Sequence, residues 1–469
     1  MCSCDLWSDP YPQRFVSDLG EAGVLEGMLG AEQGLGLEIV PSLTLGRDAR
    51  IEDVFLNKFR NSSYTNVEPS IDVFYKLLPS LTASVTANTS FDETEADLRQ
   101  LKRTRVNRFF PGKRKFCLQD ALIFDFAELS EPQNRASVLN GKPFFSRRIG
   151  VNGGEPVDIL VSGKVTGRVD RFKIGVLHSL VDSRASIAQQ NLTVGRIAMN
   201  LLGESSLGAI VTHGDPDGKV DNTVVGTDFI YRDTNFRSGK ALGGTAWYQH
   251  SFTQGDALLE EEVTSLRNGD AKQNAYGWTL EYPNDLVNWK LGFRGIEKNF
   301  NPELGFVNRR GIRQYDGEYR NRIRRGGWLR TFDTTVSGLV VTDASNKIET
   351  GKFSITPVAI ATDIGEDIEF SYSHHMERPR PNSEVAGDPI AVRSYTFDRG
   401  SMRLSTSRNR QVRGEVHLEA GSYYDGQLTS VAPEIEWRPS RHWLFLLHYA
   451  FNDIRLPDNR RQSHLVRLR

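Results

Sequence analysis

Long stretches in which apolar and polar residues alternate are the feature that most restricts the fold of this chain. In the segment 276–282, the even-numbered positions carry Tyr, Trp or Leu, and the odd-numbered positions carry small or polar residues. The same alternation runs through 37–45, 161–170, 289–294, 367–377, 412–420 and 442–451. A period of two is typical of β-strands that have one apolar and one polar face.

The number and length of these segments favour one large antiparallel sheet. There are about seventeen of them, most of roughly 9–13 residues, the length that crosses a bilayer at a tilt. Strands of soluble proteins are shorter, typically about 5–6 residues. Turn-forming residues separate the segments at 215–218, 283–285, 325–327, 425–426 and 456–458. Short turns between successive strands indicate an up-and-down meander.

The two faces of these segments differ in a way that suits a membrane barrel. The polar faces carry charged residues such as Lys290, Arg294 and Glu415, which suit a water-filled lumen, whereas Trp, Phe, Tyr and Leu on the opposite faces suit lipid. A soluble sandwich or propeller would also show alternation, but it would have many edges to protect, and a closed sheet has none. We therefore predict an all-β fold, a transmembrane antiparallel up-and-down β-barrel of roughly 16–20 strands. It would span 35–469, with residues 1–34 as a disordered or linker remnant.

Composition is compatible with this prediction and argues against other classes. Mean hydropathy is −0.43 and 38% of residues are hydrophobic, values that a soluble protein and a membrane barrel share, because only every second strand residue faces lipid. No stretch approaches the ~18 consecutive apolar residues of a membrane helix. The 58 basic and 59 acidic residues give a net charge of −1, which does not indicate a nucleic-acid partner. The three cysteines suggest no disulfide framework.

Residues 92–140 interrupt the alternation. The stretch 92–102 reads as a short charged helix, and about fifty residues without alternation are too many for a simple hairpin loop. Two interpretations remain open, a plug or lid folded into the lumen and a long extracellular loop. The motif of the plug interpretation consists of Phe109, Phe110, Pro111, Lys113 and Arg114.

Five motifs of the chain resemble one bacterial family. In chain order they are 86–97, 106–114 (Val-Asn-Arg-Phe-Phe-Pro-Gly-Lys-Arg), 145–150, 163–168 and 300–307 (Phe-Asn-Pro-Glu-Leu-Gly-Phe-Val). In content and order they resemble the barrel domain called domain of unknown function 5916, which commonly follows a family-nine carbohydrate-binding-like module. The resemblance covers about residues 35–469 and implies a bacterial outer-membrane β-barrel.

The chain departs from that family pattern in the interrupting segment and at both ends. Gly112 stands where the family often has an acidic residue, and 115–117 departs from the family's Pro-Phe-Phe. The family normally begins with a signal peptide and a β-sandwich module, but residues 1–10 lack the signal-peptide pattern. Its barrels usually end on an aromatic residue, whereas 465–469 reads Leu-Val-Arg-Leu-Arg. We expect a truncated or mis-started reading frame, in which the closing strands would be missing.

A metal site has one weak candidate in the sequence. Asp215, Asp217 and Asp221 surround a glycine with the spacing of a calcium loop, but the terminal bidentate Glu of an EF-hand is missing. A solvated hairpin turn is the interpretation that we favour. His374 and His375 cannot share an ion, because neighbouring residues of a strand point to opposite faces.

Enzyme activity has no support in the sequence. A glycosidase needs two carboxylates that converge, which one sequence cannot identify, and Gly-x-Ser-x-Gly, His-Glu-x-x-His and Walker-type motifs are absent. We predict no cofactor.

Charged strand residues are the candidates for lining a lumen. They are Arg313, Arg320 and Arg322 in a basic-rich run at 309–325, and Glu415, His417 and Glu419 in one alternating row. Arginines that line a pore favour anionic solutes. The alternatives are a rim that pairs with lipopolysaccharide phosphates and a turn that is basic only for solubility.

These observations lead to one prediction about function. We expect a barrel in the bacterial outer membrane that serves solute passage or surface capture, with a saccharide suggested only by the module usual in the family. Its partners would be outer-membrane lipid, lipopolysaccharide and the barrel-assembly machinery. The alternatives are a soluble or periplasmic β-rich carbohydrate-active hydrolase and an inactive fragment.

Overall fold

The computed structural model describes residues 34–54, 58–89, 103, 116, 119–129, 140–152, 155–183, 187–254, 273–381, 383–457 and 459–469. Twenty long strands form a single sheet in which each strand pairs with the next one along the chain, always antiparallel. In the first half these are β1 (Leu37–Val54), β2 (Lys58–Leu78), β3 (Leu81–Thr89), β6 (Ile159–Val169), β7 (Phe172–Val181), β8 (Gln190–Leu201), β9 (Ser205–His213), β10 (Asp221–Asn235), β11 (Lys240–Gln254) and β12 (Asn274–Pro283). In the second half they are β13 (Val287–Ile296), β14 (Ile312–Arg324), β15 (Leu329–Asp343), β16 (Ile348–Thr362), β17 (Asp367–Glu377), β20 (Tyr395–Ser405), β21 (Val412–Tyr423), β22 (Gly426–Ser440), β23 (Trp443–Arg455) and β24 (Arg460–Leu468).

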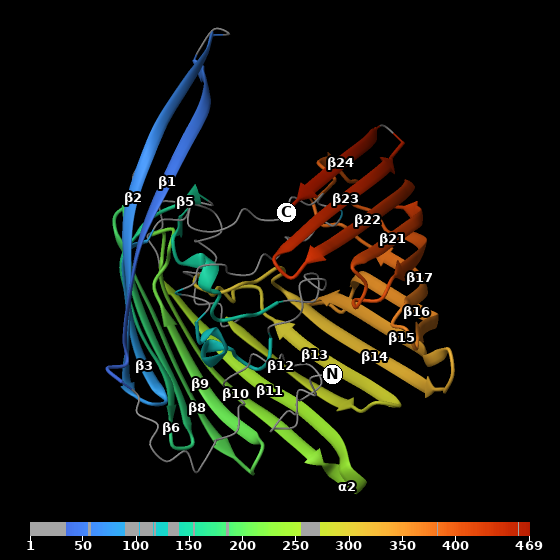
Figure 1. Ribbon diagram of the computed structural model, residues 1–469, viewed down its shortest axis with the longest axis horizontal. Helices are drawn as coiled ribbons and strands as arrows, with labels where there is room; N and C mark the ends of the chain where they lie inside the picture. The colour runs from blue at the N-terminus through green and yellow to red at the C-terminus, as the bar shows by residue number, and fades with distance from the viewer. Residues whose placement is uncertain are drawn as a thin grey trace.

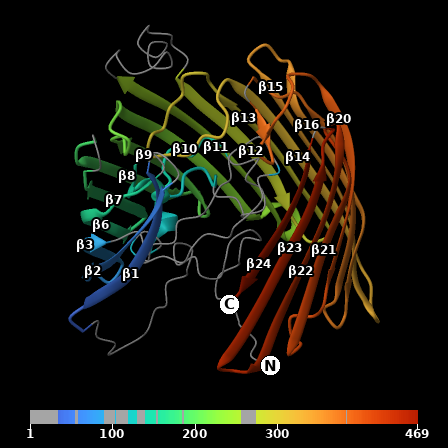
Figure 2. The same cartoon turned by 90° about the horizontal axis from the view of Figure 1, so that it is seen from above.

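The predicted all-β, antiparallel meander is confirmed. The sheet is strongly curved, so that its two halves face each other across a concave side (Figures 1 and 2). Among the described strands, β1 pairs only with β2 and β24 pairs only with β23, so closure into a barrel is not seen. The fold is therefore a curved sheet of 20 strands with two edges.

The connections at the two ends of the sheet differ in length. At one end, which we call the short-turn end, every connection is brief, as at 79–80, 170–171, 202–204, 284–286, 325–328, 363–366, 406–411 and 441–442. The other end carries the long segments 90–158, 182–189, 255–272, 297–311 and 378–394, together with a few short turns. The first described strand starts and the last one finishes at the short-turn end, as an even number of antiparallel strands requires.

The two faces of the sheet have opposite chemistry. Along β17 the exposed row is apolar and aromatic, with Ile368, Phe370 and Tyr372, while Glu369 and Ser371 on the other row are half-buried. The connections that pack on the sheet lie on its concave side and contact the polar row. The apolar row therefore lies on the convex side. The predicted division into an apolar and a polar face is thus present, with the polar face on the inside.

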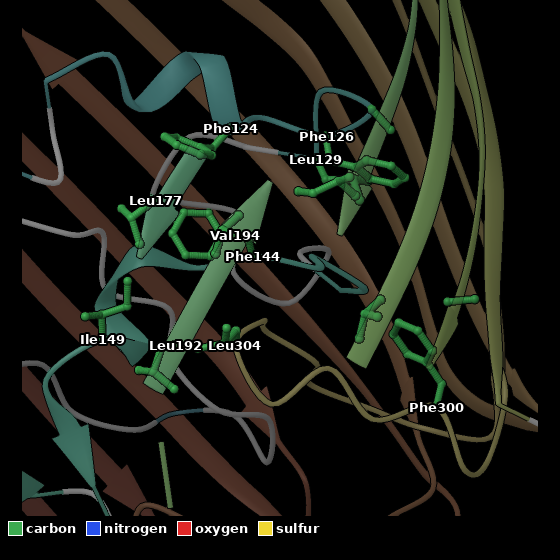
Figure 3. Close-up of a cluster of buried hydrophobic side chains, with 14 of the residues drawn as sticks. Phe124, Phe126, Leu129, Phe144, Ile149, Leu177, Leu192, Val194, Phe300 and Leu304 are labelled. Atoms are coloured by element: carbon green, nitrogen blue, oxygen red, sulfur yellow. The ribbon is translucent and has the colours of Figure 1, made fainter. Parts of the chain in front are cut away.

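Part of the long connection between β3 and β6 packs on the concave face. The 3-10 helix η3 (Ala121–Phe124) and the residues around it bury Phe124 near Leu177 of β7 and Val194 of β8, with Phe126 and Leu129 beside each other in the same cluster (Figure 3). The ring of Phe126 meets the edge of Trp247 on β11 at a centroid distance of 6.2 Å. A second 3-10 helix, η5 (Ser146–Arg148), and the small pair β4 (Val151–Asn152) and β5 (Glu155–Pro156) follow before β6 begins.

Polar bonds also tie this connection to the wall. Lys164 of β6 is buried and donates to the carbonyl oxygens of Phe116 and Gln119, both at 2.6 Å. The buried pair Arg196–Asp228 lies beneath Phe126, and Asp228 also accepts the backbone N–H of Ala127 at 3.0 Å. The described part of 92–140 therefore contacts the concave face of the sheet. Residues 1–33 and the motif Phe109, Phe110, Pro111, Lys113 and Arg114 lie outside the described residues.

The remaining elements are small. The segment between β17 and β20 contains the pair β18 (Glu384–Val385) and β19 (Asp388–Pro389), which covers a second cluster of buried side chains around Tyr423. The short helix α2 (Phe236–Gly239) joins β10 to β11. In the described part of the chain, no helix is both long and apolar enough to span a membrane.

Candidate functional site

A charged groove on the concave face is the candidate site. It encloses about 520 Å³ and lies where β14, β15, β16, β17, β20 and β21 approach the short-turn end. Six arginines line it: Arg322, Arg324, Arg330, Arg403, Arg408 and Arg413. The acids that line it are Asp333, Asp367, Glu369 and Glu415.

Strand pairing brings the first ion pairs of the groove together. Arg322 of β14 lies directly opposite Asp333 of β15, and its guanidinium donates to that carboxylate at 2.6 and 2.8 Å. Asp285, in the turn before β13, accepts from Arg324 at 2.6 Å and from Arg322 at 3.2 Å. The hydrogen bond from Arg324 is the main reason why the pKa of Asp285 falls from its ordinary 3.8 to about 2.

On the other side of the groove, Glu415 of β21 holds two arginines. Arg413, two residues earlier on the same strand, donates to it at 3.0 Å, and Arg403 of β20 lies 3.3 Å away. The Nε of Arg413 is buried and has no hydrogen-bond partner. Arg330 and Arg408 are exposed, and neither pairs with an acid among the described residues. The groove therefore combines paired arginines with two that remain accessible.

The six lumen candidates from the sequence do not all share one surface. Arg322 and Glu415 line the groove, and Arg320 lies on the same inward row of β14 as Arg322. Arg313 is on the outward row, next to exposed Tyr315, and donates to Asn346 at 2.6 Å. The prediction that Arg313 and Arg320 line the same lumen was wrong, because two residues seven positions apart on a strand point to opposite faces of the sheet.

His417 and Glu419 continue the inward row of β21 away from the groove. Glu419 is half-buried and accepts from Arg399 of β20 and from Arg103, each at 2.8 Å. Tyr423, farther along β21, donates to the carbonyl oxygen of Arg103 at 2.6 Å. The connection between β3 and β6 therefore contacts the second half of the sheet as well as the first, and the ion pair of Glu419 with Arg103 is part of that contact.

The calcium candidate assembles differently from its prediction. Asp215 and Asp217 meet Glu303 of the 297–311 connection, and ligand atoms of the three lie within 4.8 Å of one another. Asp221 is excluded from this group, because its side chain is 70% exposed and lies 3.8 Å from His213 instead. The predicted set Asp215, Asp217 and Asp221 was therefore wrong in its third member.

The contacts within this acidic group favour a structural role. The carboxylate of Asp215 accepts the backbone N–H groups of Asp217, Lys219 and Val220, as in a tight turn. Arg148 reaches both Asp217 and Glu303, at 3.5 and 3.3 Å, and already supplies a positive charge. Burial, reinforced by the charge of Asp215, raises the pKa of Glu303.

The neighbouring histidines of β17 point to opposite faces, as their spacing predicts. His374 is on the exposed row and pairs with Asp398 at 2.7 Å. The ring of His375 stacks on Phe397 at 5.0 Å on the inward side. These side chains cannot share one ion.

Five arginines of the groove were missed in the sequence: Arg324, Arg330, Arg403, Arg408 and Arg413. Arg403 and Arg413 belong to alternating rows, so periodicity could have placed them on the polar face. Arg330 lies at the start of a strand and Arg408 lies in a turn, where alternation does not predict which face a side chain takes.

No protein-family model matches the chain, and a search of curated proteins gives no significant match.

Proposed function

We propose that this chain is a bacterial outer-membrane β-barrel whose polar concave face forms a path for a small solute. The observation that carries the proposal is the row of large apolar side chains on the convex face. Eleven of these, from eleven strands, are between 43% and 49% exposed: Val85, Val176, Val211, Val225, Trp278, Leu291, Tyr319, Phe353, Phe370, Ile435 and Phe445. Soluble monomers rarely expose a contiguous apolar surface of more than a few hundred Å². A face of this kind is suited to contact with the hydrocarbon of a membrane.

Two further features support the same proposal. Short turns at one end and long loops at the other are typical of outer-membrane barrels, in which the short turns face the periplasm. Aromatic rings gather near the short-turn end, where Trp443 stacks on Phe445 and Phe445 stacks on Trp437. Such rings suit the boundary between lipid and water.

In this proposal the barrel closes when β1 pairs with β24, and the connection between β3 and β6 acts as a plug inside the lumen. The contacts of Lys164, Asp228 and Glu419 with that connection support the plug interpretation. The partners are outer-membrane lipid, lipopolysaccharide on the long-loop side and the barrel-assembly machinery. The resemblance to the barrel domain of unknown function 5916 is part of the same proposal.

Migration in detergent tests the proposal. The full chain, purified in mild detergent, is expected to run faster on a gel before boiling than after. When it is expressed behind a secretion signal in a Gram-negative host, it is expected to fractionate with the outer membrane. Conductance in a planar bilayer would show the path for solute. A detergent-independent soluble monomer whose migration boiling does not change would contradict the proposal and favour a periplasmic protein.

A further inference from the structure

The charged groove points to a specific class of solute. We infer that it binds an anionic solute through a carboxylate, sulfate or phosphate group. This inference rests on the proposed function, because it names what the polar path would take.

The balance of charge in the groove is the first argument. Its lining has six arginines and four acids, an excess of two positive charges. Asp285, just outside the lining, pairs with Arg324 and Arg322, and Glu415 holds Arg403 and Arg413. Arg330 and Arg408 remain exposed with no acid partner in the described part of the chain. With Asp285 counted, the excess is one positive charge, and Arg330 and Arg408 are the arginines that a solute can reach without breaking an ion pair.

The geometry of the donors is the second argument. A guanidinium presents a planar fork of N–H groups that matches a carboxylate, sulfate or phosphate with two bonds at once. Arg413 has a buried Nε with no acceptor, on the wall between Arg403 and the turn that carries Arg408. An oxyanion in the groove would meet the exposed guanidinium groups of Arg330 and Arg408, and rings of arginine are a common means of selecting anions in pores.

The lack of apolar surface is the third argument. Sites for neutral organic ligands are lined mostly by apolar and aromatic side chains. The apolar residues of this lining are few and aliphatic: Ala359 and Ala361 lie on the inward row, and Ile360 and Ile368 belong to the convex row and border the groove at its rim. A neutral sugar would find little surface to pack on, whereas an anion would find ion-pair partners.

Binding to the full chain in detergent micelles tests the inference. Titration calorimetry would use sulfate, phosphate and glucuronate as separate probes, which distinguishes the three groups, and glucose as the neutral probe. The double variant Arg330→Gln/Arg408→Gln is expected to weaken binding of the preferred anion by about tenfold or more, the effect of removing a charged hydrogen-bonding partner. The matched control is Arg438→Gln/Arg441→Gln, which removes two exposed arginines of β22 and the next turn, outside the groove.

The outcomes separate this inference from the proposed function. Anion binding that survives in the groove variant, an equal loss in the control, or stronger binding of glucose than of every anion would overturn the inference. Heat-modifiable migration and bilayer conductance are measured on the same preparation. A chain that inserts and conducts but binds none of the anions refutes only the inference. A chain that binds an anion through Arg330 and Arg408 but never inserts refutes only the proposed function.

Discussion

Two glycines of the concave face leave room for the aromatic rings that pack there. A Cβ on Gly175 would lie 2.9 Å from the ring of Phe124, and one on Gly226 would lie 3.0 Å from the ring of Phe126. Both distances are shorter than ordinary contact between carbon atoms. The absence of a side chain at these positions thus sets how closely the inner connection approaches the sheet.

Enlarging Gly226 is therefore expected to loosen the inner connection. Gly226→Leu should force the ring of Phe126 away from Trp247, at a free-energy cost of about 1–3 kcal/mol that is typical of overpacking. Limited proteolysis of the detergent-solubilised chain should then cut faster within 119–129. The control is Gly163→Leu on β6, where a Cβ would meet nothing within 4 Å. Equal cleavage of the two variants would show that Phe126 does not depend on the space above Gly226.

Asp285 gives a residue-level prediction about pH. Its pKa is lowered to about 2 in the folded chain, chiefly by the hydrogen bond from Arg324, against an ordinary 3.8. A depressed carboxyl pKa stabilises the folded state above the ordinary value, and this contribution is lost as the pH falls from about 4 to about 2. The group is exposed, so water screens the effect and the contribution is small.

Asp285→Asn should abolish that part of the pH dependence. Urea midpoints in detergent, measured between about pH 5 and pH 2, are expected to fall less in the variant than in the parent chain. Asp363→Asn, at another turn of the same end, serves as the control. Parallel curves for the parent and Asp285→Asn would refute the effect of the two arginines.

At the scale of whole strands, the side of the sheet should decide what a new charge does. Leu291 lies mid-strand on the convex row of β13, and Ser371 lies mid-strand on the concave row of β17. If lipid covers the convex face, Leu291→Arg should cost about 2–4 kcal/mol of folding free energy, as at the midplane of outer-membrane barrels. Ser371→Arg, next to Glu369 on a wet surface, should cost far less.

The free energy of unfolding of both variants is measured in lipid or detergent. The prediction requires Leu291→Arg to be less stable than Ser371→Arg. A chain that folds in water would tolerate Leu291→Arg, and its solubility would rise with the added charge. Lower stability for Ser371→Arg than for Leu291→Arg would likewise oppose a lipid-covered convex face.

Strands were predictable from the sequence because their signal is local. The alternating segment 367–377 coincides with β17, and 276–282 lies inside β12. The partners across strands were not predictable in this way. Glu303 joins Asp215 from a connection that lies four strands later in the chain, and no periodicity relates them. The position of Arg313, by contrast, was predictable, because alternation alone places it on the face of β14 opposite to that of Arg320.

At the scale of the whole molecule, the directions of the two edge strands are compatible with closure of the sheet. β1 leaves the short-turn end and β24 returns to it, so the two edge strands run in opposite directions, as antiparallel pairing requires. The outward row of β1 is apolar and includes exposed Ile39, and the outward row of β24 ends in exposed Val466 and Leu468. Unpaired backbone groups in hydrocarbon each cost several kcal/mol, so the proposed lipid surroundings would favour pairing of the two edges.

Cysteine pairs across the two edges test closure. In a background whose three native cysteines are replaced by serine, Ile39→Cys would be combined in turn with Gln462→Cys, His464→Cys, Val466→Cys and Leu468→Cys. Membrane-inserted protein is expected to oxidise rapidly in one of these registers, because a disulfide needs Cα atoms about 4.4–6.8 Å apart. Ile39→Cys with Val225→Cys, on a strand in the middle of the sheet, should not react within one chain. Failure of all four edge pairs, in protein that has inserted, would mean that β1 and β24 stay apart in the membrane and that other strands must cover them.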